Sequence, residues 1–304
     1  MKKNFNIFRV IILSITSICL IFILTYLLQS KNSHFSFINF DFAEPNNDFV
    51  VISENSLSLE NINNLNFNLN IDNVKFLKND ENKIKIIEKC NRQLSENEKL
   101  NIKVNNNSLD IYRENIANIT ANSFGESFNR ELIVYLPESY NENLNISTYF
   151  SDIIFNLNLN LKDIKINLST GNVNFNNTIN CSSFILEGST GDFYISSLDS
   201  NDYGISLNTG SININNLYGG GYINTTSADI NANLCSLTKD SDMYSSTGNI
   251  KLNINKDFDF LINASCDVGN IKNDFKSNKV GNNPSTTLTI YCGSGDIYIN
   301  KNYS

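Results

Sequence analysis

The chain has 304 residues, of which 41% are hydrophobic and 18% are charged, and its formal net charge is −8. This acidic balance argues against a nucleic-acid-binding protein, because there is no basic surplus to displace the counterions of phosphate groups. The single histidine, His34, excludes Ser–His hydrolase chemistry and multi-histidine metal sites from the rest of the chain.

The first thirty residues predict a membrane anchor. The stretch from Ile7 to Leu28 carries Arg9 as its one charge, and as a helix it would span about 33 Å, enough for a bilayer core. It lacks a small-residue cleavage motif, which favours an uncleaved signal-anchor over a long, cleaved signal peptide. Lys2 and Lys3 precede it, which places the N-terminus in the cytoplasm. We therefore expect a single-pass protein of the cell membrane, with the anchor over residues 1–30, a stalk over 31–48 and an extracytoplasmic C-terminal part.

Residues 49–144 contain strand-like segments without a regular period. Polar runs separate these segments, and residues 72–76 have the pattern of an early, degenerate repeat. The end repeats of a stacked fold need a polar outer face. We therefore expect residues 49–144 to form an irregular β capping subregion.

Residues 145–304 repeat with a period of about 20 residues. The seed is the turn motif Ser169-Thr170-Gly171-Asn172-Val173, and apolar and polar residues alternate on both sides of each copy, as in half-buried strands. The turn glycines are Gly171, Gly191, Gly210, Gly248, Gly269 and Gly295, with Ser151 and Ala228 at the same position in two other copies. One such unit cannot bury its apolar face alone, so the copies must stack. We predict an all-β fold, a right-handed β-solenoid like a parallel β-helix with rungs of roughly 20 residues, preceded by one transmembrane helix.

The residue after each turn glycine is an aspartate, an asparagine or a serine. Because no two aspartates are neighbours along the predicted stack, we expect a hydrogen-bonded ladder that stabilises the fold. The alternative is a row of weak Ca²⁺ sites with oxygen ligands. Its candidate ligands are Asp152, Asp192, Asp229 and Asp296. The structural role is favoured, so we expect no metal and no cofactor. Turns and outward strand positions would also account for much of the asparagine excess, 57 residues in all.

Catalysis is not expected. Two carboxylate pairs, Asp199 with Asp202 and Asp240 with Asp242, lie in loops between strands, where a solvated charge is favoured over a glycosidase pair. All four arginines precede the repeats, which counts against an arginine clamp on an acidic sugar. We therefore predict that the protein is not an enzyme and has no catalytic residues.

Cys266 and Cys292 each precede their turn glycine by three residues. If their rungs are adjacent, the two Cα atoms lie near disulfide range. Leucines fill the same column in other repeats, so buried reduced thiols are the favoured interpretation.

Tyrosines at outward positions form a candidate ligand face for a protein or a glycan. They are Tyr194, Tyr218, Tyr222 and Tyr298. The alternative is that these side chains only cover neighbouring strands. The segment Tyr291–Asn300 is expected to be the exposed last rung, a route to self-association because open sheet edges template strand addition.

The sequence resembles the bacterial DUF4097 family over roughly residues 60–300. The resemblance lies in the order of a strand-rich head, the segment Glu131-Leu132-Ile133-Val134-Tyr135-Leu136-Pro137, and repeated Ser-Thr-Gly turns. Ser151 and Ala228 depart from the glycine pattern. The family is described as β-strand repeat proteins and candidate adhesins, often membrane-anchored, at the envelope of Gram-positive bacteria. The resemblance implies a cell-surface β-solenoid with an adhesive or envelope-sensing role, and no catalytic residues.

Two functional hypotheses follow. The first is a membrane-anchored, extracytoplasmic binding module, adhesin-like, that holds a protein or cell-wall ligand. The alternative is a structural or regulatory envelope protein that self-assembles or contacts a membrane partner.

Overall fold

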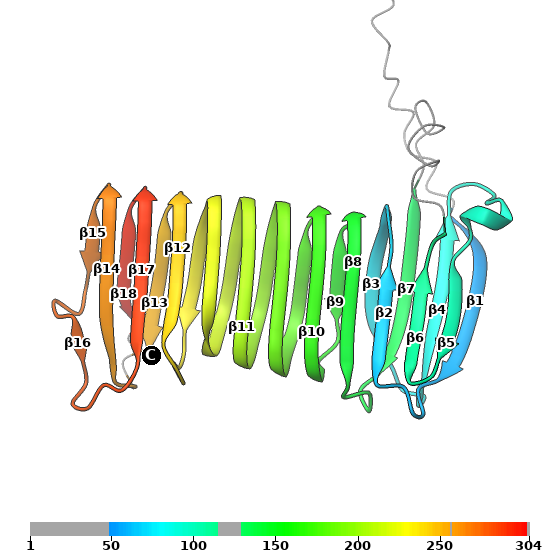
Figure 1. Ribbon diagram of the computed structural model, residues 1–304, viewed down its shortest axis with the longest axis horizontal. Coiled ribbons are helices and arrows are strands. Elements are labelled where there is room, and N and C mark those ends of the chain that lie inside the picture. Colours follow the sequence, from blue (N-terminus) through cyan, green and yellow to red (C-terminus); the bar gives the residue numbers. More distant parts are fainter. Residues whose placement is uncertain (1–48, 115–128, 256, 303–304) are drawn as a thin grey trace, which may run out of the picture. The chain divides into compact units, whose positions relative to one another are not determined.

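The computed structural model describes residues 49–114, 129–255 and 257–302, which form an all-β structure (Figure 1). Within these ranges no helix is long and apolar enough to cross a bilayer. The expected anchor (1–30) and stalk (31–48) lie outside the described residues. The described part contains one short 3-10 helix, η1, at Glu96–Glu98.

The strands before the regular repeats are β1 (Val50–Ser58), β2 (Asn64–Asn68), β3 (Asp72–Asn79), β4 (Lys83–Cys90), β5 (Asn101–Asn105), β6 (Ser108–Tyr112), β7 (Arg130–Pro137), β8 (Asn143–Phe150) and β9 (Ile153–Asn156). The remaining strands are β10 (Leu159–Thr170), β11 (Val173–Leu234), β12 (Ser241–Thr247), β13 (Ile250–Asn255), β14 (Phe260–Val268), β15 (Ile271–Asn273), β16 (Lys279–Val280), β17 (Thr287–Ser294) and β18 (Ile297–Asn302). Strand β11 runs for 62 residues because the chain keeps its strand pairing through several turns.

Neighbouring repeats pair in parallel and in register. Ile164 of β10 lies opposite Leu144 of β8 on one side and Phe184 of β11 on the other. After the turn, Val173 lies opposite Ile153 of β9. Each rung therefore has a strand before its turn and a strand after it, and we call the two resulting sides of the stack the pre-turn side and the post-turn side. The repeats stack as rungs, as predicted.

The core runs continuously between the two sides of the stack. Along β10, Ile164 and Ile166 are buried while Lys165 between them is exposed, which is the alternation expected of a half-buried strand. At the head end, the rings of Phe76 and Phe155 stack with centroids 4.6 Å apart. The ring of Phe155 also stacks on that of Phe175, at 4.3 Å. Each rung thus buries its apolar residues against its neighbours.

The turn glycines allow the rungs to approach closely at one corner. Gly191 has φ +148°, and a Cβ atom there would lie 1.9 Å from the carbonyl oxygen of Gly171 in the next rung. A larger residue would therefore push neighbouring rungs apart as well as strain the backbone. The corner at Ala228 has no positive φ, and its carbonyl oxygen accepts hydrogen bonds from the hydroxyls of Thr225 and Ser245, both at 3.1 Å.

The stack continues past residue 144 into the head. Strands β2 and β3 pair in parallel with β8 and β9, so the degenerate repeat at residues 72–76 is part of a full rung. Strands β6 and β7 pair in parallel with β2 and β3 and form the next rung outward, although they come later in the chain. Strand β4 pairs antiparallel with β7 and β1, and β5 pairs antiparallel with β6. These antiparallel strands cover the head end of the stack (Figure 1).

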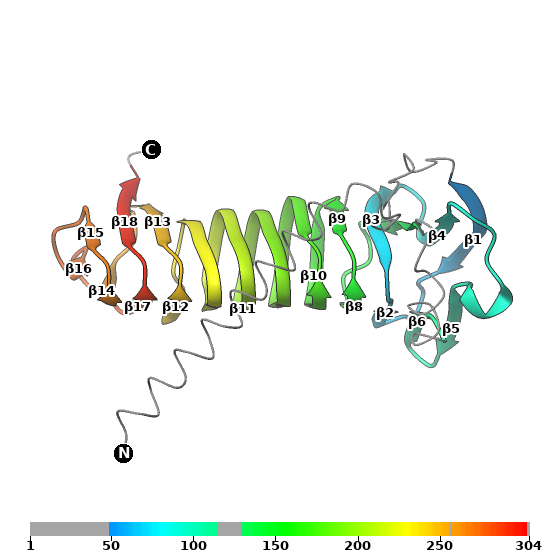
Figure 2. The same ribbon diagram turned by 90° about the horizontal axis from the view of Figure 1, so that it is seen from above.

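The C-terminal rung is not the last rung of the stack. Strand β17 lies between β12 and β14, and β18 lies between β13 and β15. Figure 2 shows the order β14, β17, β12 along one side and β15, β18, β13 along the other. The expectation that Tyr291–Asn300 is the exposed last rung is therefore wrong. The chain forms the outermost rung, β14–β15, and then returns to fill the position inside it, with β16 pairing antiparallel to β14.

Candidate functional site

A ladder of side chains follows the turn corner of the stack. The Oδ1 atom of Asp152 accepts a hydrogen bond from the backbone N–H of Asn172 at 2.8 Å, and Asn172 Oδ1 accepts one from the N–H of Asp192 at 2.9 Å. The same contact joins Asp229 to Asn249 at 2.6 Å, Asn249 to Asp296 at 3.0 Å, and Asp296 to Asn270 at 2.9 Å. Because the C-terminal rung is inserted, Asp296 lies between two asparagines, and acidic and neutral residues alternate there.

This ladder bears on the four aspartates considered as Ca²⁺ ligands. Neighbouring carboxylates are two rungs apart, about 9.6 Å at the usual strand spacing, with a neutral residue between them. Calcium takes six to eight oxygen ligands at about 2.3–2.6 Å. Among the described residues, no group of three or more His, Cys, Asp or Glu side chains is placed to hold a metal. The arrangement favours the stabilising role.

The four tyrosines expected to form one ligand face lie on different sides of the stack. Tyr194 and Tyr298 follow their turn glycines and belong to the post-turn side. Tyr222 precedes its turn and lies on the pre-turn side, with its ring 2.7 Å from where a Cβ of Gly204 would be. Tyr218 lies in the segment that connects one rung to the next. These tyrosines therefore do not form a single face.

A groove on the pre-turn side is lined by two tyrosines that the sequence did not single out. Tyr244 of β12 lies opposite Tyr291 of β17, and their rings stack with centroids 5.1 Å apart and an interplanar angle of 12°. The side chain of Tyr244 is 40% exposed. The adjoining hollow has a volume of about 590 Å³. We call it the tyrosine groove, and its polar lining includes Ser206, Asn208, Asn224, Thr226, Asp242 and Thr289.

Strand pairing sets the layout of the tyrosine groove. Asn224 lies opposite Tyr244 on the neighbouring strand, so small polar side chains occupy the rung next to the stacked rings. Tyr291 lies on the other side of Tyr244. One face of the Tyr244 ring is therefore covered by Tyr291, and the other face points over the Asn224 rung. The groove therefore has an aromatic wall, formed by Tyr244 and Tyr291, beside a floor of polar side chains from the neighbouring rungs.

Hydrogen bonds hold the two rings in place. The hydroxyl of Tyr291 donates to Asp267 Oδ2 at 2.6 Å, and the hydroxyl of Ser246 donates to the Tyr244 oxygen at 3.1 Å. The hydrogen bond to Asp267, followed by partial desolvation and the negative charge, raises the pKa of Tyr291 to about 12. The Tyr291 hydroxyl therefore stays protonated and neutral at physiological pH. Among the described residues that line the groove, Asp242 is the one that carries a charge, and none is basic.

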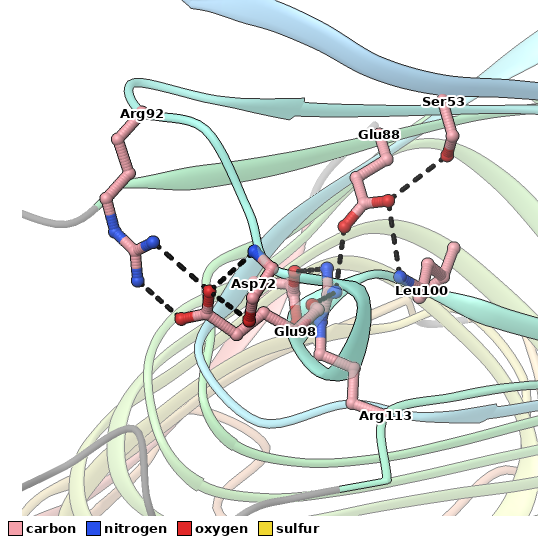
Figure 3. Close-up of polar contacts among 8 residues, drawn as sticks. Ser53, Asp72, Glu88, Arg92, Glu98, Leu100 and Arg113 are labelled. Carbon is pink, nitrogen blue, oxygen red and sulfur yellow. Dashed lines mark hydrogen bonds and ion pairs between the residues drawn. The ribbon is translucent and has the colours of Figure 1, made fainter.

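The head end holds a buried ion cluster that the sequence analysis did not predict (Figure 3). Asp72 and Glu88 are fully buried, and Arg113 is 4% exposed. Two N–H groups of Arg113 donate to the two oxygens of Asp72, with Nε to Oδ2 at 2.9 Å, and a third donates to Glu88 Oε1 at 2.8 Å. Glu88 Oε2 accepts from the Ser53 hydroxyl at 3.1 Å and from the Leu100 N–H at 3.2 Å. The cluster links β1, β3 and β4 to the residues next to β5 and β6, and it therefore stabilises the head end of the stack.

Helix η1 adjoins the same cluster. The carbonyl oxygen of Glu98 accepts a hydrogen bond from Arg113 at 2.6 Å. Its carboxylate pairs with Arg92 at 2.5 Å and accepts the backbone N–H of Ser95 at 2.9 Å. The hydrogen bond from Arg92, aided by those from Ser95, lowers the pKa of Glu98 to about 2. The carboxylate is therefore ionised down to strongly acidic pH.

Two of the four aspartates considered as carboxylate pairs make contacts within the fold. Asp202 pairs with Lys239 at 2.5 Å, and Asp240 accepts the Thr287 N–H at 2.7 Å. Asp242, expected to be a solvated loop charge, instead lies at an outward position of β12 and lines the tyrosine groove.

Cys266 and Cys292 lie opposite one another on β14 and β17 and are free thiols. Each thiol donates to the carbonyl oxygen of a corner glycine, Gly295 or Gly248, at 3.1 Å. Cys292 is buried, as expected, whereas Cys266 is only partly buried.

One signal in the sequence could have identified the stacked tyrosines. Tyr244 and Tyr291 both lie four residues before a turn glycine, so an alignment of the repeats puts them in one outward column. Stacking the repeats in chain order, however, places Ser265 between them. Only the inserted C-terminal rung brings the two rings together.

The structure is similar to several solved structures. Similar solved structures include a proposed lipid-binding protein from Parabacteroides distasonis, with 13% identity, a TM-score of 0.50, and coverage of 85% of this chain and 98% of that one. A proposed adhesin from Bacteroides fragilis has 11% identity and a TM-score of 0.47, with coverage of 84% and 98%. Another from Parabacteroides distasonis has 13% identity and a TM-score of 0.47, with the same coverage.

No curated protein matches the sequence. The family model described as Toastrack DUF4097 matches residues 62–300, which is most of the chain and agrees with the resemblance seen in the sequence. The chain belongs to the Toastrack DUF4097 family.

Proposed function

We propose that the protein is a membrane-anchored, extracytoplasmic binding module that holds a component of the cell wall, whether glycan or protein, in the tyrosine groove, without catalysis. The observation that carries the proposal is the stacked pair Tyr244–Tyr291 beside a hollow of about 590 Å³. Ligand sites have volumes of this order, and they combine aromatic surface with a few fixed polar groups. The anchor and the orientation rest on the apolar stretch Ile7–Leu28 and the basic residues before it.

The groove is organised before any ligand arrives. Tyr244 and Tyr291 project from paired strands, and each hydroxyl has a hydrogen-bond partner in the structure. Aromatic side chains fixed in this way lose little conformational freedom on binding. A site on paired strands is also positioned more precisely than a site on loops. These features favour recognition over a merely protective covering of the sheet.

The proposal is tested with the full chain in nanodiscs, incubated with isolated Gram-positive cell walls and sedimented. We expect retention of the wild type and loss of retention in the double variant Tyr244→Ala/Tyr291→Ala. The matched control is Tyr298→Ala, which removes a tyrosine of the same rung from the post-turn side and should be retained like the wild type. Absence of retention in the wild type, or equal retention of the double variant and the control, would overturn the proposal.

A further inference from the structure

We propose that the ligand of the tyrosine groove is a neutral glycan, with one pyranose ring stacked on Tyr244. This inference rests on the proposed binding function and names the class of ligand. The first step concerns the free face of the Tyr244 ring, which points over the Asn224 rung while Tyr291 covers the opposite face. An aromatic face carries a partial negative charge. It therefore attracts the weakly positive C–H groups that a pyranose presents on one side of its ring.

The second step concerns the floor of the groove. Ser206 and Thr226 contribute hydroxyl groups, and Asn208 and Asn224 contribute side-chain amides. Hydroxyls and amides both donate and accept hydrogen bonds, which suits a ligand rich in hydroxyl or acetamido groups. The one apolar aliphatic residue in the lining, Met243, is itself 1% exposed. An acyl chain in the groove would therefore cover these polar groups without offering them hydrogen bonds, which costs free energy.

The third step concerns charge. In the described part of the chain, Asp242 is the charged residue of the lining, and no lysine or arginine accompanies it. A phosphate or a uronic acid placed in the groove would face a carboxylate without a cation to pair with, and like charges repel. The net charge of the chain, −8, acts in the same direction. Anionic cell-wall polymers are therefore disfavoured, whereas neutral sugars can donate hydroxyl groups to Asp242.

The test uses isothermal titration calorimetry of the full chain in nanodiscs, which avoids detergents with sugar head groups. The probes are two trisaccharides of different charge: tri-N-acetylchitotriose, which is neutral, and trigalacturonic acid, which is anionic. We expect saturable binding of the neutral probe, weakened about tenfold or more by Tyr244→Ala, which is about 1.4 kcal/mol or more, because the variant removes the aromatic face on which the sugar ring stacks. Tyr298→Ala should leave the affinity within about twofold. This residue lies on the post-turn side, outside the groove.

Other outcomes would overturn the assignment. Equal or tighter binding of the anionic probe would show that the groove does not select neutral over acidic glycans. Unchanged affinity of Tyr244→Ala for the neutral probe would show that the stacked ring is not the site. If cell walls retain the chain through Tyr244 and Tyr291 but no neutral trisaccharide binds, the binding module stands and the neutral-glycan assignment fails. If cell walls do not retain the chain, the proposed function itself fails.

Discussion

Replacing Gly191 with alanine tests whether close approach at the turn corner holds the rungs together. The added Cβ atom would lie 1.9 Å from the carbonyl oxygen of Gly171, whereas such contacts are essentially never shorter than 3.0 Å. The two corners must therefore separate by about 1 Å, which weakens the hydrogen bond from the Gly171 N–H to the Thr190 carbonyl, now 2.9 Å. Backbone strain at φ +148° costs about 1–3 kcal/mol, and the hydrogen bond about 0.5–1.5 kcal/mol. The expected loss of stability is about 2–4 kcal/mol.

Thermal unfolding of the full chain, followed by far-ultraviolet circular dichroism, measures this loss. For a domain of this size each kcal/mol lowers Tm by about 2–4 °C, so Gly191→Ala should melt about 4–16 °C below the wild type. The matched control is Ala228→Gly, which changes the same corner column where the backbone has no positive φ. It should lose at most about 1 kcal/mol, through the greater freedom of glycine in the unfolded chain. A Gly191→Ala variant that melts within about 2 °C of the wild type would refute the reasoning.

Three further variants test the ion cluster, the corner ladder and a shifted pKa. Arg113→Met leaves two buried carboxylates without their cation and should destabilise the fold by about 3–5 kcal/mol in urea denaturation; a loss below about 1 kcal/mol would contradict this. Asn172→Asp places three carboxylates on consecutive rungs and should lower Tm at low ionic strength but much less in about 1 M salt, which screens exposed charges; an equal loss at both salt concentrations would exclude repulsion as the cause. Glu98 has a pKa of about 2 in the fold, below its ordinary value, so it adds stability above that ordinary value and loses it as the pH falls towards 2. The Tm difference between wild type and Glu98→Gln should therefore shrink between about pH 5 and pH 2, and a constant difference would contradict the assignment.

Much of the fold could be predicted because each repeat contains the sequence signals for its own turn and its own two strands. The glycine of the motif Ser169-Thr170-Gly171-Asn172-Val173 marks a corner, and the alternation around it marks two strands that need neighbours on both sides. The order of the rungs could not be predicted in the same way. The rungs of Gly248, Gly269 and Gly295 share one local pattern, so any of them can pair with any other. Their order depends on long-range contacts, such as the loop after β15 that pairs with β14 through β16.

The buried ion cluster and the stacked tyrosines could not be predicted for the same reason. Asp72, Glu88 and Arg113 are far apart in the sequence and meet only because β6 and β7 return to the outside of β2 and β3. The stacked tyrosines meet because β17 enters between β12 and β14. In each case the sequence shows the residues themselves. Which residues become their neighbours depends on a rung that stacks out of chain order. Local periodicity carries no information about that order.

The inserted C-terminal rung constrains how such a protein can change in length over evolution. In a solenoid whose rungs follow chain order, a repeat duplicated after the last one adds a rung to the free end. Here the rung β17–β18 is enclosed by β14–β15, and the head is closed by β6–β7 and the antiparallel strands beyond them. A duplicated terminal repeat would have to cross the β14–β15 rung to reach the outer edge of the stack. Insertions and deletions of whole repeats should therefore accumulate in the middle of the gene, between the segments that encode β9 and β13, while both ends keep their length.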